Sequence, residues 1–301
     1  MGSAKILLFL ALGAFALVFA FGWIRVTRLR RTAHDAGAPG WWELVVGAVT
    51  NFFDTLGIGS FAPTTSAFKL RGTVADELIP GTLNVGHTLP VIVQAFVFIV
   101  AVDVGSGTLI SMIAASVAGA WLGAAIVADM PRRRIQIGMG VALLFAAVFF
   151  AMTNLDLFPG GGEALSLQGT RMGVALGASF VLGALMTLGI GMYAPCMILV
   201  ALLGMNPRAA FPIMMGSCAF LMPVAGLRFI QRDSYSPRAS FGLTAGGIPA
   251  VLAAAFIVQS LPLTVLRWLV VAVVLYTSFT MLRSAQREAA TRAVVTIPAG
   301  G

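Results

Sequence analysis

Glycines, hydroxyl side chains and one acid interrupt an apolar segment of the sequence between residues 51 and 65. This stretch reads Asn-Phe-Phe-Asp-Thr-Leu-Gly-Ile-Gly-Ser-Phe-Ala-Pro-Thr-Thr. Glycine costs about 1 kcal/mol in a helix interior and proline about 3 kcal/mol, but proline is accepted at the first helical position. We therefore expect one helix to end within 56–59 and another to begin at 62–63. The N–H groups of that helix start, beside Gly57 and Gly59, can bind an anion; alternatively, the glycines only allow close helix packing.

Three side chains at this first break are able to do chemistry. Ser60 and Thr64 carry hydroxyl groups that can donate to a ligand or cap the second helix. Asp54 is an acid in an apolar segment, where a carboxylate is costly unless it faces a cavity. Asp54 is therefore a candidate proton carrier, and the alternative is a structural acid that holds neighbouring Thr and Asn side chains in place.

Two further polar residues, Asn84 and His87, lie in the next apolar segment. Their spacing of three residues places them on one face of a helix. They can donate hydrogen bonds to an anion, and His87 can also relay protons with Asp54, because histidine changes its charge near neutral pH. The alternative is a polar cluster that packs helices together.

The first break recurs 132 residues later in the sequence. The eight residues that begin at Leu56 read LGIGSFAP, and the eight that begin at Leu188 read LGIGMYAP. Further glycine and proline pairs follow in the same order. We therefore predict an internal duplication, with Gly189 and Gly191 forming a second anion-binding break. Interrupted segments at matching places in two halves are the best sequence indication of a transporter's binding site.

The second half offers different side chains at the matching positions. Cys196 takes the place of Thr64, and Ser217 takes the place of Asn84 after a slip of one residue. Both are candidates to line the other half of a shared cavity. The neighbouring methionines suit a polarisable sulfur ligand, although adaptable core packing explains them equally well; they are Met192, Met197, Met214 and Met215.

The composition indicates a polytopic membrane protein. The chain has 301 residues, of which 59% are hydrophobic and 10% are charged, and its mean hydropathy is +0.96. A soluble domain carries about 25% charged residues. The net charge of +8 is concentrated between the apolar spans, as membrane topology requires, so nucleic acid is not an expected partner. The sequence contains no nucleotide-binding loop, and it predicts no cofactor, no metal site and no disulfide.

These patterns divide the chain into five regions. The apolar run Ile6–Trp23 is followed by a basic cluster, which is typical of a retained span and not of a signal peptide. We predict an N-terminal transmembrane helix with a basic cytoplasmic linker (1–40), a first repeat (41–152), an outer loop (153–168), a second repeat (169–283) and a disordered cytoplasmic tail (284–301). The predicted helices of the repeats are 41–56, 63–70, 78–102, 108–128, 134–152, 172–188, 195–203, 209–228, 240–258 and 263–282.

The basic residues predict how the repeats are oriented. Suppose that each short helix returns to the side from which the preceding helix enters the membrane. Most of the 19 Lys and Arg residues then lie in the cytoplasm, and the outer set is Lys5, Arg171, Arg208 and Arg267. Such an asymmetry is the usual signal of orientation. It predicts two inverted-topology repeats, each with a broken or re-entrant helix pair, in an all-α protein with its N-terminus outside and its C-terminus in the cytoplasm.

These features resemble the TauE/SafE family of membrane proteins, which are sulfite or sulfonate-related anion exporters. The resemblance rests on residues 51–60, on the second-half echo at 183–195, and on duplicated bundles joined by a variable loop. It covers about 41–282. Met192 and Tyr193 differ from the smaller, glycine-rich residues expected after Gly191. The resemblance implies a small sulfur-containing or organic anion as substrate, without specifying which one.

The leading hypothesis is a secondary transporter for such an anion in the cytoplasmic (inner) membrane. It would work by alternating access between the repeats, with proton coupling through Asp54 and His87 as an option. An intramembrane hydrolase with Ser60 as nucleophile and His87 as base is the alternative from another class, and an anion channel is a third hypothesis. The direction of transport and the oligomeric state stay open.

Overall fold

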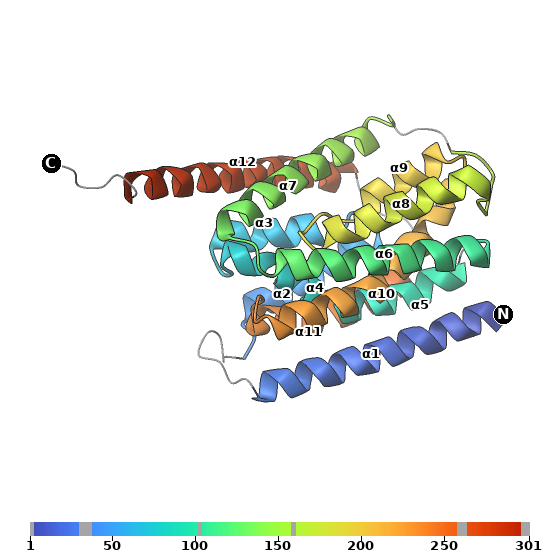
Figure 1. The fold of residues 1–301 in the computed structure, drawn as a ribbon, viewed down its shortest axis with the longest axis horizontal. Coiled ribbons are helices and arrows are strands. Elements are labelled where there is room, and N and C mark those ends of the chain that lie inside the picture. The colour runs from blue at the N-terminus through green and yellow to red at the C-terminus, as the bar shows by residue number, and fades with distance from the viewer. Residues whose placement is uncertain (1–2, 30–37, 102–103, 158–160, 258–263, 296–301) are drawn as a thin grey trace.

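The computed structural model describes residues 3–29, 38–101, 104–157, 161–257 and 264–295. These residues form helices, and apart from an isolated bridge between Ala164 and Met205 they contain no β-structure. The elements in chain order (Figure 1) are α1 (Ser3–Leu29), α2 (Trp41–Thr55), α3 (Phe61–Arg71), η1 (Asp76–Leu78), α4 (Ile79–Gly86), α5 (Thr88–Ala101), α6 (Ser106–Val127), α7 (Arg132–Asn154), α8 (Gly169–Met186), α9 (Tyr193–Leu202), η2 (Pro207–Ala209), α10 (Ala210–Gln231), α11 (Pro237–Ile257) and α12 (Thr264–Val295).

Several of these helices are long and apolar enough to cross a bilayer, which needs about 20 apolar residues. Among the described residues, the segments that qualify alone are Ile6–Arg28, Ser106–Val127, Arg132–Asn154, Gly169–Met186 and Pro207–Gln231. Helices α4 and α5 qualify together as a bent pair. The chain is therefore an all-α protein of the multi-pass membrane type, as its composition predicts, and α1 corresponds to the predicted N-terminal span.

Both predicted helix breaks are present. Helix α2 ends at Thr55 and α3 begins at Phe61, while α8 ends at Met186 and α9 begins at Tyr193. Gly57 and Gly189 both have φ in the left-handed region, at +87° and +105°. Glycine adopts this conformation without the steric cost that a Cβ atom brings, which is why the chain turns at these positions.

The predicted single helix at 78–102 is wrong, because the chain bends by 40° between α4 and α5. Pro90 has no N–H group to bond the carbonyl of Gly86, four residues earlier. The hydroxyl of Thr244 on α11 donates to that carbonyl instead, at 2.7 Å. The break falls at His87, so this histidine lies at a helix junction and not within a continuous helix.

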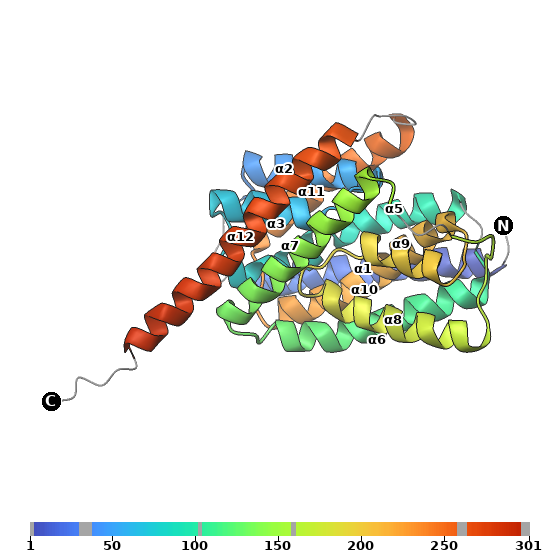
Figure 2. The same cartoon turned by 90° about the horizontal axis from the view of Figure 1, so that it is seen from above.

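The prediction of a disordered tail after Arg283 is also wrong as far as residue 295. Helix α12 continues to Val295. The segment after Arg283 is rich in Ala, Arg, Gln and Glu, which favour helix, and Ala285 within it is buried. Arg133 on α7 donates to the carbonyl of Ala285. Figure 2 shows α7 and α12 side by side, with α12 extending beyond the bundle.

Close helix pairs are built on glycines that face a neighbouring backbone. Helix α2 packs against α11, and α6 packs against α8. A Cβ atom at Gly119 on α6 would collide with the backbone of Phe180 on α8, and one at Gly246 on α11 would collide with the backbone of Leu44 on α2. Small residues allow this approach, which is the usual basis of helix association in membranes.

Helix α10 lies at the centre of the bundle and is mostly buried. It contacts α5, α6, α4 and α1. Helix α1 runs along the outside of the bundle (Figure 1), where Trp23 stacks on Phe241 of α11 with 4.2 Å between the ring centroids. The central position of α10 places its side chains next to both breaks.

Candidate functional site

The two breaks meet in the interior of the bundle, although 132 residues separate them in the sequence. A Cβ atom built on Gly57 of the first break would lie 2.8 Å from the hydroxyl oxygen of Tyr193, in the second. A cavity of about 40 Å³ lies between the breaks. Gly59, Ser60 and Phe61 line it from one side, and Gly191, Met192 and Tyr193 from the other. A cavity of this size holds a few water-sized groups.

At each break, one helix ends and the next begins beside this cavity. In both breaks the turn that ends the first helix is closed by hydrogen bonds, from Gly57 N to Asp54 O and from Gly189 N to Met186 O. Ser60 and Met192 then precede α3 and α9 as N-cap residues, and neither side chain caps its helix. The capping interpretation of Ser60 is therefore wrong, and the helix starts retain donors that need another partner.

Asp54 uses some of these donors. Its side chain is 8% exposed and lines the cavity. Ser60 donates to the carboxylate through its hydroxyl and its backbone N–H. The side-chain amide of Gln94 on α5 also donates to Asp54, with 3.1 Å between Nε2 and Oδ2. The carboxylate of Asp54, which belongs to α2, therefore lies at the start of α3.

Gln94 is a site residue that sequence reasoning missed. It is completely buried and lines the cavity. Its Nε2 donates to Asp54 and also to the hydroxyl oxygen of Thr55, at 3.0 Å. The sequence did contain an indication of this role, because Gln94 is the one strongly polar side chain between Leu89 and Ala101. A buried amide in such a segment needs a polar partner.

His87 belongs to a separate polar network behind the cavity. Its ring is completely buried, with Nδ1 3.0 Å from Oδ1 of Asn51 and Nε2 3.1 Å from the hydroxyl of Thr64. Thr64 in turn donates to Thr50. No hydrogen bond given by the structure for the described residues joins His87 to Asp54, so the predicted relay between them is not formed in this conformation.

Asn84 contacts the second break instead of the first. Its Nδ2 donates to the carbonyl of Pro80 and, at 3.4 Å, to the carbonyl of Thr187. Its Oδ1 is buried and has no hydrogen-bond partner in the described part of the chain. Asn84 and His87 therefore have different partners, because Asn84 reaches Thr187 whereas His87 bonds Asn51 and Thr64.

The second half contributes sulfur atoms to the cavity from three of the methionines singled out in the sequence, Met192, Met214 and Met215, but not from Cys196. Cys196 is buried near the carbonyl of Ala210, and Ser217 accepts a hydrogen bond from Ser116 on α6. Neither residue lines the cavity. The lining of this half is instead formed by Met186, Met192, Met214, Met215 and Cys218.

Of the predicted site residues, the structure therefore brings together four around the cavity: Asp54, Gly59, Ser60 and Gly191. The others lie in the surrounding structure and do not line it; they are Gly57, Thr64, Asn84, His87, Gly189, Cys196 and Ser217. In the described residues, no group of three or more His, Cys, Asp or Glu side chains is placed to hold a metal ion.

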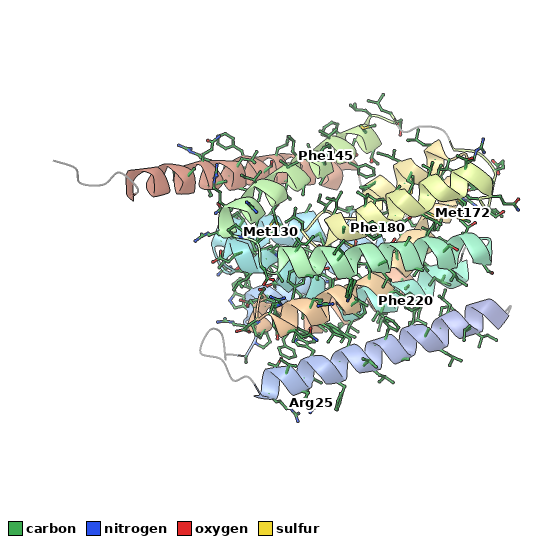
Figure 3. The ribbon with its side chains drawn as sticks, viewed as in Figure 1. Arg25, Met130, Phe145, Met172, Phe180 and Phe220 are labelled. Atoms are coloured by element: carbon green, nitrogen blue, oxygen red, sulfur yellow. The ribbon has the colours of Figure 1, made fainter. Side chains whose placement is uncertain are left out.

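A larger groove of about 880 Å³ adjoins the cavity and shares Gly59 and Gly191 with it. It runs between α7 and α8, and the described residues that line it carry no charged side chain. Phe145 of α7 lies at this groove, with its ring largely exposed (Figure 3). The breaks are thus bordered by an apolar groove as well as by the small polar cavity.

Comparisons of this chain with protein-family models, with curated proteins and with solved structures find no match.

Proposed function

We propose that the protein is a secondary transporter that moves a small sulfur-containing anion across the cytoplasmic membrane by alternating access. The observation that carries this proposal is the meeting of the two glycine breaks at one cavity. Each break is followed by a helix whose first residue lines the cavity, and helix starts bind anions. Broken helices at matching places in two halves are a recurring form of transporter site.

An inverted duplication is part of this proposal, and the packing supports it. If α2 corresponds to α8, α3 to α9, α6 to α11 and α7 to α12, the α2–α11 contact is the counterpart of the α8–α6 contact. The α7–α12 contact is then its own counterpart. Gly72 and Gly204, which the repeat pairs, follow the two short helices with φ of +65° and +75°. The loop charges orient the N-terminus outside and the C-terminus in the cytoplasm.

The size of the cavity and the resemblance to the TauE/SafE family together suggest the class of substrate. A cavity of about 40 Å³ suits a compact group such as the oxyanion of sulfite or a sulfonate. The sulfur atoms of the second half offer a polarisable wall to such a group. No other partner besides the lipid bilayer enters the proposal.

The hydrolase alternative is not favoured by the hydrogen bonds. Both ring nitrogens of His87 are engaged by Asn51 and Thr64. Ser60 donates to Asp54. A serine nucleophile needs its base within hydrogen-bond reach, and no such bond joins Ser60 to His87 among the described residues.

The experiment is a binding and uptake panel with a matched pair of glycine variants. A Cβ atom at Gly191 would meet no atom within 4 Å, so Gly191→Val fills space at the cavity without a clash; Gly59→Val does the same, with added backbone strain at φ +85°. Gly173→Val on α8 is the control, because its Cβ atom also meets nothing and it lies away from the cavity. The panel is sulfite, sulfate, thiosulfate, sulfoacetate, taurine and acetate.

We expect at least one sulfur-containing anion to stabilise the wild-type and Gly173→Val proteins and to enter proteoliposomes with saturable kinetics. Gly191→Val and Gly59→Val should lose about a hundredfold in affinity, because several hydrogen bonds of about 0.5–1.5 kcal/mol each are blocked. Unsaturable flux would indicate a channel. If Gly191→Val binds every anion as well as Gly173→Val does, the substrate site lies elsewhere.

A further inference from the structure

The carboxylate of Asp54 lies where the proposed substrate would bind at the first break. It accepts from the hydroxyl and the backbone N–H of Ser60, so a negative group of the chain itself satisfies the start of α3. No Lys or Arg is among the described residues that line the cavity. A substrate anion in the cavity would therefore lie next to the uncompensated negative charge of Asp54. The donors of Ser60 would already be engaged by that carboxylate.

The side-chain amide of Gln94 is held in one orientation by this charge. A carboxylate only accepts hydrogen bonds, whereas an amide has an NH₂ group that donates and an oxygen that accepts. The NH₂ group of Gln94 therefore faces Asp54, at 3.1 Å. The amide oxygen Oε1 is buried without a hydrogen-bond partner in the described part of the chain. While Asp54 is charged, this side of the cavity therefore offers two acceptors, which disfavour the binding of an anion.

A second buried Gln–Asp pair shows what is distinctive about the first. Gln136 on α7 donates to Asp76 at 2.8 Å, and its Oε1 is likewise buried without a partner in the described residues. Asp76 is also paired with Lys69, with 2.6 Å between Nζ and Oδ2. The ammonium group of Lys69 thus compensates the charge of Asp76. Among the described residues that line the cavity, Asp54 has no such cation beside it.

We propose that Gln94 is a positioning residue that converts the protonation of Asp54 into donors for the substrate anion. When Asp54 takes up one proton from water, its new O–H group donates to Oε1 of Gln94, and the amide turns about its last side-chain bond. The NH₂ group then faces the cavity, and the Ser60 donors are released to the anion. One proton and one anion enter together, so a monovalent anion leaves the charge of the site unchanged.

The other titratable groups near Asp54 do not replace it in this step. Cys218 of α10 and Tyr193 of α9 line the same cavity, and both are neutral in their ordinary state near neutral pH. His87, at the α4–α5 junction, is held by Asn51 and Thr64 in the separate network. The inference rests on the proposed function, because it needs an anion that binds at the breaks.

The test measures the affinity of the full-length purified protein for methanesulfonate as a function of pH, since the charge of this anion does not change in the accessible range. Infrared difference spectra record whether a protonated carboxyl group forms on binding. The variants are Gln94→Met, Asp54→Asn, and both together, and Gln136→Met is the matched control because it alters the other buried Gln–Asp pair.

In the wild-type protein and in Gln136→Met, we expect the dissociation constant to rise about tenfold per pH unit above the titration of Asp54, as uptake of one proton requires. The infrared spectrum should show a carboxyl band that is absent from Asp54→Asn, whose affinity should not depend on pH. Gln94→Met should shift that band, because the O–H group loses its acceptor. In the Asp54→Asn background, Gln94→Met should weaken binding about three- to tenfold, the effect of one hydrogen bond.

Two outcomes would overturn the inference, and they are distinguishable. An unshifted band together with unchanged affinity in both Gln94→Met proteins would remove Gln94 from the coupling while leaving the proposed function intact. Failure of the wild-type protein to bind methanesulfonate or any anion of the panel at any pH would overturn the proposed function and this inference with it. If Gln94→Met does not purify as a folded protein, Gln94→Glu replaces it. The introduced carboxyl group and Asp54 should then share one proton at rest. The infrared band of this shared proton should differ from the wild-type carboxyl band, and an identical band with unchanged affinity would contradict the inference.

Discussion

The first and second breaks have similar backbones and different side chains. Gly57 and Gly189 both turn in the left-handed region, and a short helix follows each. At the first break the cavity is lined by Asp54 and Ser60, while the matching positions of the second break carry Met186 and Met192. One half therefore holds an acid and its hydrogen-bond donors, and the other holds thioethers.

This difference indicates a division of roles between the halves. In the proposed mechanism, the donors of the first break become available only after Asp54 loses its charge. The second break has no acid at the corresponding place, and Met186 and Met192 line the cavity there. We therefore expect proton dependence to come from the first half, and contact with the apolar or polarisable part of the substrate to come from the second.

The largest expected effect concerns the inversion of the two halves, which labelling tests directly. Thr73 and Arg208 are exposed residues in the loops that follow α3 and α9, the two short helices that the repeat pairs. We predict that Thr73→Cys reacts with an impermeant thiol reagent only from the cytoplasm, and Arg208→Cys only from outside. The background carries serine in place of the native cysteines.

The native cysteines Cys196 and Cys218 are buried, so their removal serves as a precaution against slow labelling. Arg133→Cys, in the first turn of α7, provides an independent cytoplasmic reference. Reaction of Thr73→Cys and Arg208→Cys from the same side of the membrane would show that the halves are parallel, and the proposed correspondence between them would be lost.

A smaller effect is expected from alanine at the two equivalent glycines. A Cβ atom at Gly57 meets the hydroxyl of Tyr193 at 2.8 Å, whereas the nearest atom to one at Gly189 is Cε of Met139, at 3.5 Å. Left-handed backbone costs about 1–2 kcal/mol for a residue with a side chain, and overpacking adds about 1–3 kcal/mol. Gly57→Ala should lower the free energy of unfolding in detergent by about 2–5 kcal/mol, and Gly189→Ala by about 1–2 kcal/mol.

A double-mutant cycle separates the two contributions to the Gly57 effect. Tyr193→Phe removes the hydroxyl that the new Cβ atom would meet, so the loss caused by Gly57→Ala should be smaller in this background. Equal losses for Gly57→Ala and Gly189→Ala in the wild-type background would mean that the breaks do not contact each other as the structure has them.

The breaks and the all-α membrane class could be predicted from the sequence, because glycine, proline and hydropathy act locally. The bend at His87 could not. Pro90 and Pro223 occupy matching positions, yet the chain breaks near Pro90 and α10 continues through Pro223. The difference depends on a distant residue, since Thr244 of α11 bonds the carbonyl that Pro90 leaves free.

The side chains that line the cavity were predictable only in part, for the same reason. Asp54 and Ser60 lie next to a break in the sequence, so proximity identified them. Gln94 lies 40 residues from its carboxylate partner, and it reaches the cavity only because α5 packs beside the breaks. The analogy between Cys196 and Thr64 failed because Thr64 itself turns away from the cavity toward Thr50 and His87.

The smallest expected effect concerns one hydroxyl group that the first break has and the second lacks. Ser60→Ala removes a donor to Asp54 and, in the proposed complex, to the anion, while the backbone N–H remains. Anion affinity at low pH should fall by about 0.5–1.5 kcal/mol, the net contribution of one hydrogen bond.

Ser66→Ala is the control on the same helix, because its buried hydroxyl donates to the carbonyl of Ala62 and does not line the cavity. Met192→Ala, at the matching place in the second half, removes no hydrogen bond and should leave the pH dependence unchanged. If Ser60→Ala binds methanesulfonate as tightly as Ser66→Ala does, the first break supplies no side-chain donor, and the contrast between a polar half and a sulfur half would have no consequence for binding.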